Sequence, residues 1–187
     1  MQKRGLQMIS RRDFTSAPAV EGRTLTGIAA VYGQPSRLIR EQGRSFTERI
    51  DAGAFGDIGD VKLYYGHDAS MPLARTQSGT LKLDSRADGL HYSATLPETT
   101  LGNDVRELLS RGDLTGAMSF GFYVTRDTWN KTRTERTVNA ATLVEVSLVQ
   151  DAAYPQTTSS LRHVGAEFQR AVDARLELHL HRMRTYV

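Results

Sequence analysis

The sequence contains no cysteine among its 187 residues. The absence of thiols excludes disulfide bonds, thiolate metal sites and a cysteine nucleophile. Long hydrophobic runs are also missing, and none approaches the roughly 20 apolar residues that a membrane-spanning helix requires. The N-terminal segment Met1–Gly5 is basic but no apolar stretch follows it, so it does not have the pattern of a secretory signal. We therefore expect an intracellular protein that lies in no membrane.

Aromatic residues and excess charge are both scarce. Aromatic side chains make up 7% of the sequence, and the formal net charge is only +3. Dispersed charge of this size argues against specific nucleic-acid binding. A basic nucleic-acid-binding module stays as an alternative, which would show steeply salt-dependent DNA binding. With 39% hydrophobic and 24% charged residues, the composition is that of a folded soluble domain.

Apolar segments with strand-like patterns predict most of the secondary structure. They are Thr24–Gly33, Phe46–Ile50, Val61–Tyr65, Thr80–Asp84, Gly89–Pro97, Leu114–Thr125 and Val138–Val149. The turn residues Asp88 and Gly89 predict a hairpin between the fourth and fifth of these segments. Asp51–Phe55 reads as a turn into a short helix, and Ser70–Pro72 as a loop.

Two segments have helical periodicity. Leu101–Arg111 places its apolar residues on one face, and Gly112 ends the pattern. A second stripe recurs near the C-terminus: Phe168, Val172, Leu176, Leu180, Met183 and Val187. This stripe could pack on the domain, on a second copy of the chain or on another protein. We expect an N-terminal arm (1–20), a main domain (21–160) and a C-terminal amphipathic helix or tail (161–187).

Three residues of catalytic type lie within or at the end of strand-like segments. They are His67, Ser119 and Glu145. A serine nucleophile needs a base to accept its proton, and the base needs a partner that holds its tautomer. Neighbouring strands can bring such groups together. If Glu145 is buried, the imidazole N–H of His67 is the partner we expect for it, which leaves the other ring nitrogen for Ser119.

Each of these residues also has an ordinary structural interpretation. Ser119, taken alone, is more typical of a solvent-facing serine in a half-buried strand. A single histidine such as His67 is more often a surface residue than a catalytic base. Glu145 stands between two valines, where a carboxylate is either solvated or buried and paired. Residue type and spacing alone therefore favour a serine hydrolase without establishing one.

The remaining polar clusters are weaker candidates. His179 and His181 could bind a metal, but no third ligand accompanies them at ligand spacing, and a helical surface is the more typical interpretation. Basic residues between Arg126 and Arg136 are typical of a solvated hairpin tip. We expect neither a metal ion nor an organic cofactor.

Several segments together resemble the prohead protease family of tailed phages. They are Phe46–Phe55, Val61–Asp68, Pro72–Arg75, Gly89–Leu96, Ser119–Phe122, Leu143–Val149 and Ala153–Pro155. The matching order runs from about Thr24 to Pro155, which is most of the chain. The joint pattern is much more specific than any single motif in it.

The resemblance implies an α+β fold similar to the herpesvirus assemblins. Such a fold has a strand-rich β-barrel core with flanking helices. It also implies that Ser119 is the nucleophile and His67 the base. In assemblins the third member is a second histidine, and Glu145 takes its place in chain order here.

The implied function is a serine endopeptidase of capsid maturation. Its substrates would be the scaffold, or the scaffold-like N-terminal segment of the major capsid protein, and the enzyme would also cut itself. It would act in the host cytoplasm, inside the immature capsid (prohead), with a homo-oligomer through the C-terminal helix as a further expectation. The alternative is a non-enzymatic capsid assembly or scaffolding factor with a protease-like domain.

Overall fold

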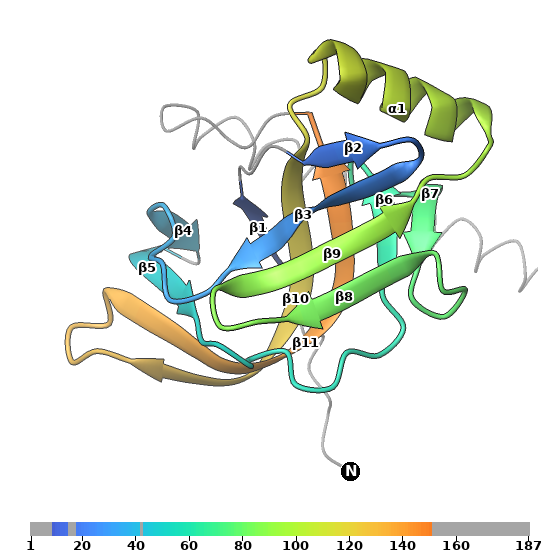
Figure 1. Cartoon of the computed structure of the whole chain (residues 1–187). Helices are drawn as coiled ribbons and strands as arrows, with labels where there is room; N and C mark the ends of the chain where they lie inside the picture. The colour runs from blue at the N-terminus through green and yellow to red at the C-terminus, as the bar shows by residue number, and fades with distance from the viewer. Residues whose placement is uncertain (1–8, 15–17, 42, 151–187) are drawn as a thin grey trace, which may run out of the picture. The chain divides into compact units, whose positions relative to one another are not determined.

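The computed structural model describes residues 9–14, 18–41 and 43–150 of the chain (Figure 1). These residues form strands and one helix, and no helix among them is long and apolar enough to span a membrane. In chain order the elements are β1 (Ser10–Phe14), β2 (Ala19–Glu21), β3 (Thr24–Val31), β4 (Ile39–Glu41), β5 (Arg44–Ile50), β6 (Lys62–Tyr65), β7 (Asp68–Arg75), β8 (Leu81–Ser85), β9 (Gly89–Thr95), α1 (Thr100–Arg111), β10 (Ala117–Trp129) and β11 (Glu135–Val149).

The strands form two sheets. A seven-stranded sheet has the order β1-β10-β11-β5-β4, and β6 joins it by pairing with both β11 and β7. A four-stranded sheet has the order β2-β3-β9-β8. The start of β11 pairs in parallel with β5, whereas its end pairs in parallel with β6. Among the described residues both sheets are open, so the structure does not show the closed barrel that the family resemblance implies.

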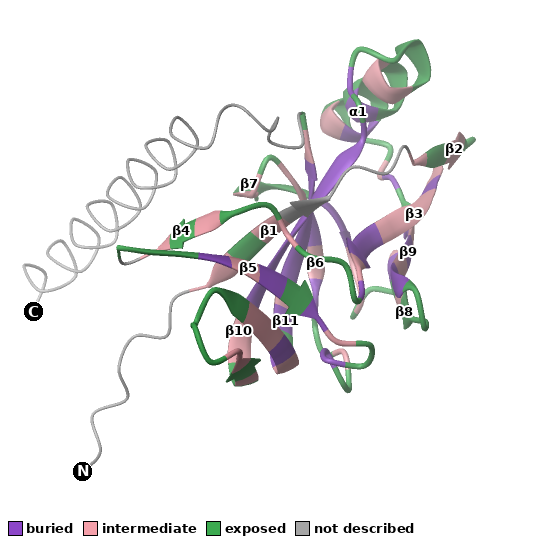
Figure 2. Cartoon of the chain, turned by 90° about the vertical axis from the view of Figure 1, so that its left-hand side faces the viewer, coloured by how far each residue is buried: buried purple, intermediate pink, exposed green. Residues whose placement is uncertain are grey.

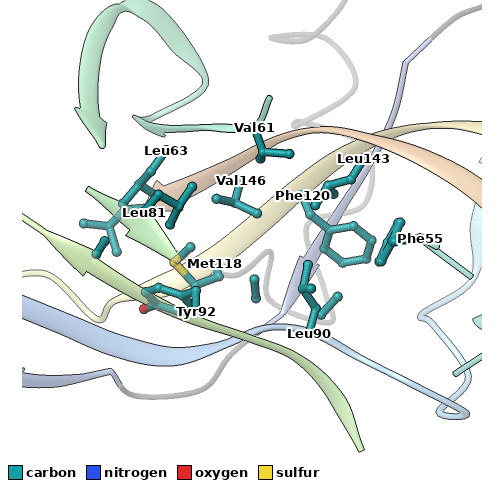
Figure 3. Packing of buried hydrophobic residues seen from close by; sticks show 14 of the residues in the cluster. Phe55, Val61, Leu63, Leu81, Leu90, Tyr92, Met118, Phe120, Leu143 and Val146 are labelled. Carbon is teal, nitrogen blue, oxygen red and sulfur yellow. The ribbon is translucent and has the colours of Figure 1, made fainter. Parts of the chain in front are cut away.

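The hydrophobic core lies between the two sheets (Figure 3). Strand β10 contributes Met118, Phe120 and Phe122, which alternate along the strand and are all buried. Leu90 and Tyr92 of β9 face them from the other sheet. Figure 2 shows that burial is concentrated in the middle of the seven-stranded sheet and falls toward its ends. The side of β10 that carries these three residues therefore faces the core.

The predicted helix is confirmed as α1, with well-defined ends. The Thr99 hydroxyl accepts a hydrogen bond from the Gly102 N–H at the N-terminus. Gly112 ends the helix with φ 76°, a left-handed conformation that glycine adopts without steric cost. The apolar stripe of the helix packs against the core through the buried Val105 and partly buried leucines.

Two local predictions are wrong. The segment after Asp51 forms a turn rather than a short helix, because Gly53 and Gly56 both adopt positive φ angles (79° and 48°). The expected loop around Pro72 is part of strand β7. Proline is accommodated there because, among the described strands, β7 pairs with β6 alone, and the register shifts beside Pro72.

The predicted domain boundaries stay predictions. Strand β1 and the start of β2 fall within the segment that was expected to be an N-terminal arm. The predicted C-terminal helix (161–187), including His179 and His181, lies outside the described residues.

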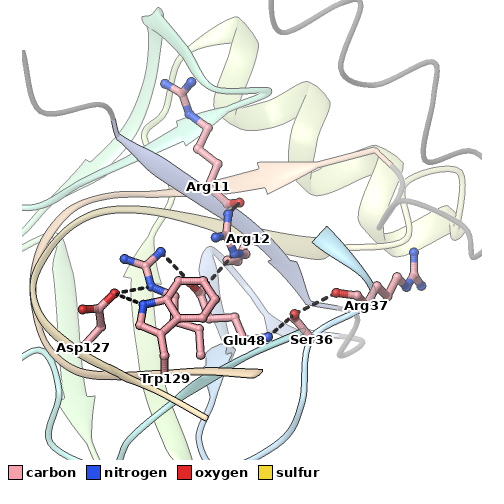
Figure 4. Close-up of polar contacts among 8 residues, drawn as sticks. Arg11, Arg12, Ser36, Arg37, Glu48, Asp127 and Trp129 are labelled. Atoms are coloured by element: carbon pink, nitrogen blue, oxygen red, sulfur yellow. Dashed lines mark hydrogen bonds and ion pairs between the residues drawn. The ribbon is translucent and has the colours of Figure 1, made fainter. Parts of the chain in front are cut away.

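A buried charge network fixes the N-terminal strand to the seven-stranded sheet (Figure 4). Glu48 of β5 is only 2% exposed. Its carboxylate accepts hydrogen bonds from Arg12 Nε at 2.7 Å and from Arg136 Nη1 at 3.2 Å. Arg136 and Trp129 also donate to Asp127, and the Arg136 guanidinium lies over the Trp129 ring. The network thereby links β1, β5, β10 and β11.

We expect Glu48→Gln to destabilise the protein by about 2–3 kcal/mol, because it leaves Arg12 and Arg136 without their shared counter-charge. Both guanidiniums keep some contact with solvent, which holds the effect below that of a fully buried pair. Urea denaturation measures the change. Glu98→Gln, at an exposed position, is the matched control. A loss for Glu48→Gln no larger than that of the control would contradict the account.

Candidate active site

His67 is positioned by a tight turn between β6 and β7. Tyr65 and Asp68 are paired across this hairpin, so Gly66 and His67 form its two-residue loop. Both have φ of 62°, as the type I′ turn typical of such hairpins requires. A positive φ is unusual for a residue with a side chain, and histidine tolerates it better than most. The Gly66 N–H donates to the Leu148 carbonyl at 2.8 Å, which fixes the turn against β11.

Glu145 lies on β11 and meets the imidazole of His67. Nδ1 of His67 lies 2.8 Å from Oε1 of Glu145, a carboxylate whose residue is only 6% exposed. Burial by itself raises the pKa of Glu145, but the hydrogen bonds from His67 and Arg11 outweigh it, and the pKa is lowered from its ordinary value. The carboxylate is therefore ionised at neutral pH and can hold the Nδ1–H tautomer of the imidazole.

Ser119 lies on β10, on the sheet face opposite the phenylalanine side chains of the core. It is directly opposite Ser147 of β11 in the strand register, and Gly121 is opposite Glu145. Since alternate residues of a strand share a face, these four positions lie on one face of the sheet. Glu145 and Ser147 are therefore close neighbours of Ser119 on that face.

Ser119 and Ser147 are both 0% exposed, and neither hydroxyl has a hydrogen-bond partner among the described residues. The structure thus pairs His67 with Glu145 but does not bring Ser119 into a hydrogen bond with His67. Full burial excludes the solvent-facing interpretation of Ser119. It also means that a peptide can reach Oγ only if covering atoms move. A buried hydroxyl that lacks a hydrogen bond costs about 1–3 kcal/mol relative to one that has a partner.

Sequence reasoning missed three residues at this site: Arg11, Gly121 and Ser147. The Arg11 Nε donates to Oε1 of Glu145 at 3.0 Å, on the same oxygen that His67 contacts. A Cβ added to Gly121 would lie 2.9 Å from Cγ of Glu145, so the glycine leaves room for the carboxylate side chain. Two of them had a signal in the sequence. Gly121 comes two residues after Ser119, and Ser147 comes two residues after Glu145, so each shares a strand face with a catalytic candidate.

None of the other candidates within the described residues forms a hydrogen bond or ion pair with His67 or Glu145. His91 of β9 pairs with the exposed Asp88 at 3.0 Å, beside the four-stranded sheet. No group of three metal-ligating side chains occurs within the described part of the chain. A shallow cavity of about 520 Å³ lies on the four-stranded sheet, lined in part by Lys82, Arg86 and His91.

An acid in contact with an imidazole, beside a strand that carries a buried serine, combines the residue types that serine hydrolases use. Residues 12–170 match the family described as Caudovirus prohead serine protease, and the chain belongs to this family. The fold is also similar to that of the capsid assembly protease of bacteriophage T4, with a TM-score of 0.47 and 9% identity. That alignment covers 76% of this chain and 98% of the T4 chain. No curated protein matches the sequence significantly.

Proposed function

We propose that the chain is a serine endopeptidase that cleaves scaffold, or the scaffold-like N-terminal segment of the major capsid protein, during maturation of a phage prohead. Membership in the prohead serine protease family supports this proposal. The observation that carries it in the structure is the 2.8 Å contact between His67 and Glu145, beside the strand that bears Ser119.

In the proposed mechanism, Nε2 of His67 accepts the proton of Ser119 as Oγ attacks a peptide carbonyl carbon. Glu145 holds Nδ1–H and stabilises the imidazolium that forms. The imidazolium then gives its proton to the leaving amine as the C–N bond breaks, which leaves an ester between Ser119 and the acyl fragment. A water molecule, deprotonated by His67, hydrolyses that ester and restores the serine.

The partners follow from the same proposal. The enzyme acts inside the immature capsid in the host cytoplasm, where scaffold and capsid protein are its substrates and its own chain is a further one. The C-terminal segment (161–187) is proposed to dock the enzyme on these proteins or to join two copies. No cofactor takes part in the mechanism.

Co-expression with the major capsid protein of the same phage tests this function. Intact mass spectrometry should find capsid protein shortened at its N-terminus with the wild-type chain and full-length capsid protein with Ser119→Ala. If a folded wild-type chain enters the capsid and cleaves neither capsid protein nor scaffold, the proposal fails. The chain would then be an assembly factor with a protease-like domain.

A further inference from the structure

Arg11 reaches the candidate active site from the edge of the sheet. In the strand register Arg11 of β1 is paired with Gly121 of β10, and Gly121 is paired with Glu145 of β11. The three residues therefore form a row across three strands. With neighbouring strands about 4.8 Å apart, the Cα atoms of Arg11 and Glu145 are separated by about 10 Å. Two long side chains can meet over that distance only if the position between them is unobstructed.

Gly121 provides the open position. A Cβ at this residue would lie 2.9 Å from Cγ of Glu145 and 3.1 Å from Cγ2 of Ile9, distances too short for an ordinary side chain. The glutamate side chain thus lies across β10, with the side chain of Ile9 beside it. Glycine at this position is what lets a residue of β1 touch a carboxylate of β11.

Arg11 and His67 bind the same oxygen of the same carboxylate. Oε1 of Glu145 accepts from Arg11 Nε at 3.0 Å and contacts His67 Nδ1 at 2.8 Å. The neutral imidazole donates a hydrogen bond without a net charge, whereas the guanidinium is always positive. A carboxylate that is 6% exposed requires such a counter-charge to remain ionised, and Arg11 provides it.

The other groups around Glu145 do not replace this charge. Lys62 of β6 is its register neighbour but forms no ion pair with it among the described residues. Tyr64 of β6 is near enough for the Glu145 charge to raise its pKa, after the larger effect of burial. Arg11 and His67 are the groups within hydrogen-bond distance of the carboxylate in the described residues.

We infer that Arg11 is a positioning residue of the candidate active site: it holds Glu145 ionised and oriented toward His67, so the N-terminal strand completes the site. This inference rests on the proposed function. Arg11 acts through Glu145 and touches no reacting atom. The competing idea is that Arg11 merely tethers β1, as its neighbour Arg12 does on the opposite face through Glu48 (Figure 4).

The test compares Arg11→Gln, Arg11→Lys and wild type in cleavage of the major capsid protein. We expect Arg11→Gln to lower kcat by about 10- to 100-fold with little change in KM, because the imidazole is misplaced or in the wrong tautomer. The acid limb of the kcat/KM profile should move to higher pH, since the Glu145 carboxylate is protonated more easily without the cation beside it. Arg11→Lys should recover part of the loss.

Two controls separate positioning from tethering. Arg126→Gln removes an exposed cation from β10 and should change nothing. Arg12→Gln should lower the melting temperature without moving the pH profile of the remaining activity. Arg11 has a side chain that is 37% exposed, so its variants are expected to fold. Unchanged or increased activity in Arg11→Gln, or a pH profile identical to wild type, would overturn the inference.

A second readout does not depend on catalysis. Carbon NMR titration of the glutamate carboxyls, with Glu145 assigned through Glu145→Gln, should show a higher pKa for Glu145 in Arg11→Gln than in wild type. An unchanged Glu145 titration would refute the inference even in an active enzyme. If the wild-type chain cleaves nothing, the proposed function fails, while the titration still decides whether Arg11 controls the carboxylate.

Discussion

Ser119→Ala should lower the rate of capsid-protein cleavage by about five to six orders of magnitude, because no other group can form the acyl-enzyme. The variant should be at least as stable as wild type. The Ser119 hydroxyl is fully buried and has no hydrogen-bond partner among the described residues, so its removal costs no hydrogen bond. Cleavage time courses measure the rate, and calorimetry measures the melting temperature.

Ser147→Ala is the matched control for this prediction. Ser147 is the cross-strand neighbour of Ser119, equally buried and likewise without a partner in the described structure. It should therefore tolerate alanine just as well while cleavage continues. If Ser147→Ala removed cleavage and Ser119→Ala did not, the nucleophile would have been assigned to the wrong strand. If both variants cleaved, a serine mechanism at this site would be excluded.

Glu145→Gln should lower kcat by about four orders of magnitude, the second-largest effect. The amide nearly matches the carboxylate in size, but its NH₂ group can donate to Nδ1 of His67. Donation there favours the tautomer that carries its proton on Nε2, which cannot accept the proton of Ser119. Arg11 also loses its charged partner, although its own exposure allows water to solvate it.

The expected loss is in kcat rather than in folding, and stability measurements separate the two. Glu107→Gln on the exposed side of α1 makes the same chemical change away from the site and should leave the rate unchanged. An orienting carboxylate is worth about four orders of magnitude in kcat. If the kcat of Glu145→Gln stayed within about tenfold of wild type, Glu145 would have no role in the mechanism.

Much of the fold could be predicted because its signals are local. Alternation along Leu114–Thr125 identified strand β10, and Gly112 marked the end of α1. Strand β7 was missed because Pro72 usually ends a strand, and only the edge position and the local register shift explain its presence. The open sheets of the described structure could not be foreseen from alternation, which does not specify how edges meet.

The site was predictable only in part. The residue types of His67, Ser119 and Glu145 marked them as candidates, and their catalytic roles stay predictions. Arg11 was not identifiable, since its role depends on a register that spans β1, β10 and β11. The complete burial of Ser119 was also unexpected, because strand alternation predicts one covered face and the first part of β10, Ala117–Phe122, is covered on both.

Labelling with a fluorophosphonate probe, followed by mapping of the adduct by mass spectrometry, tests the central claim most directly. The account predicts one adduct, on Ser119, and its loss in a folded His67→Ala variant. An adduct on Ser147 would contradict the assignment of the nucleophile. An unlabelled wild-type chain that still cleaves capsid protein would show that the reaction does not pass through an activated serine.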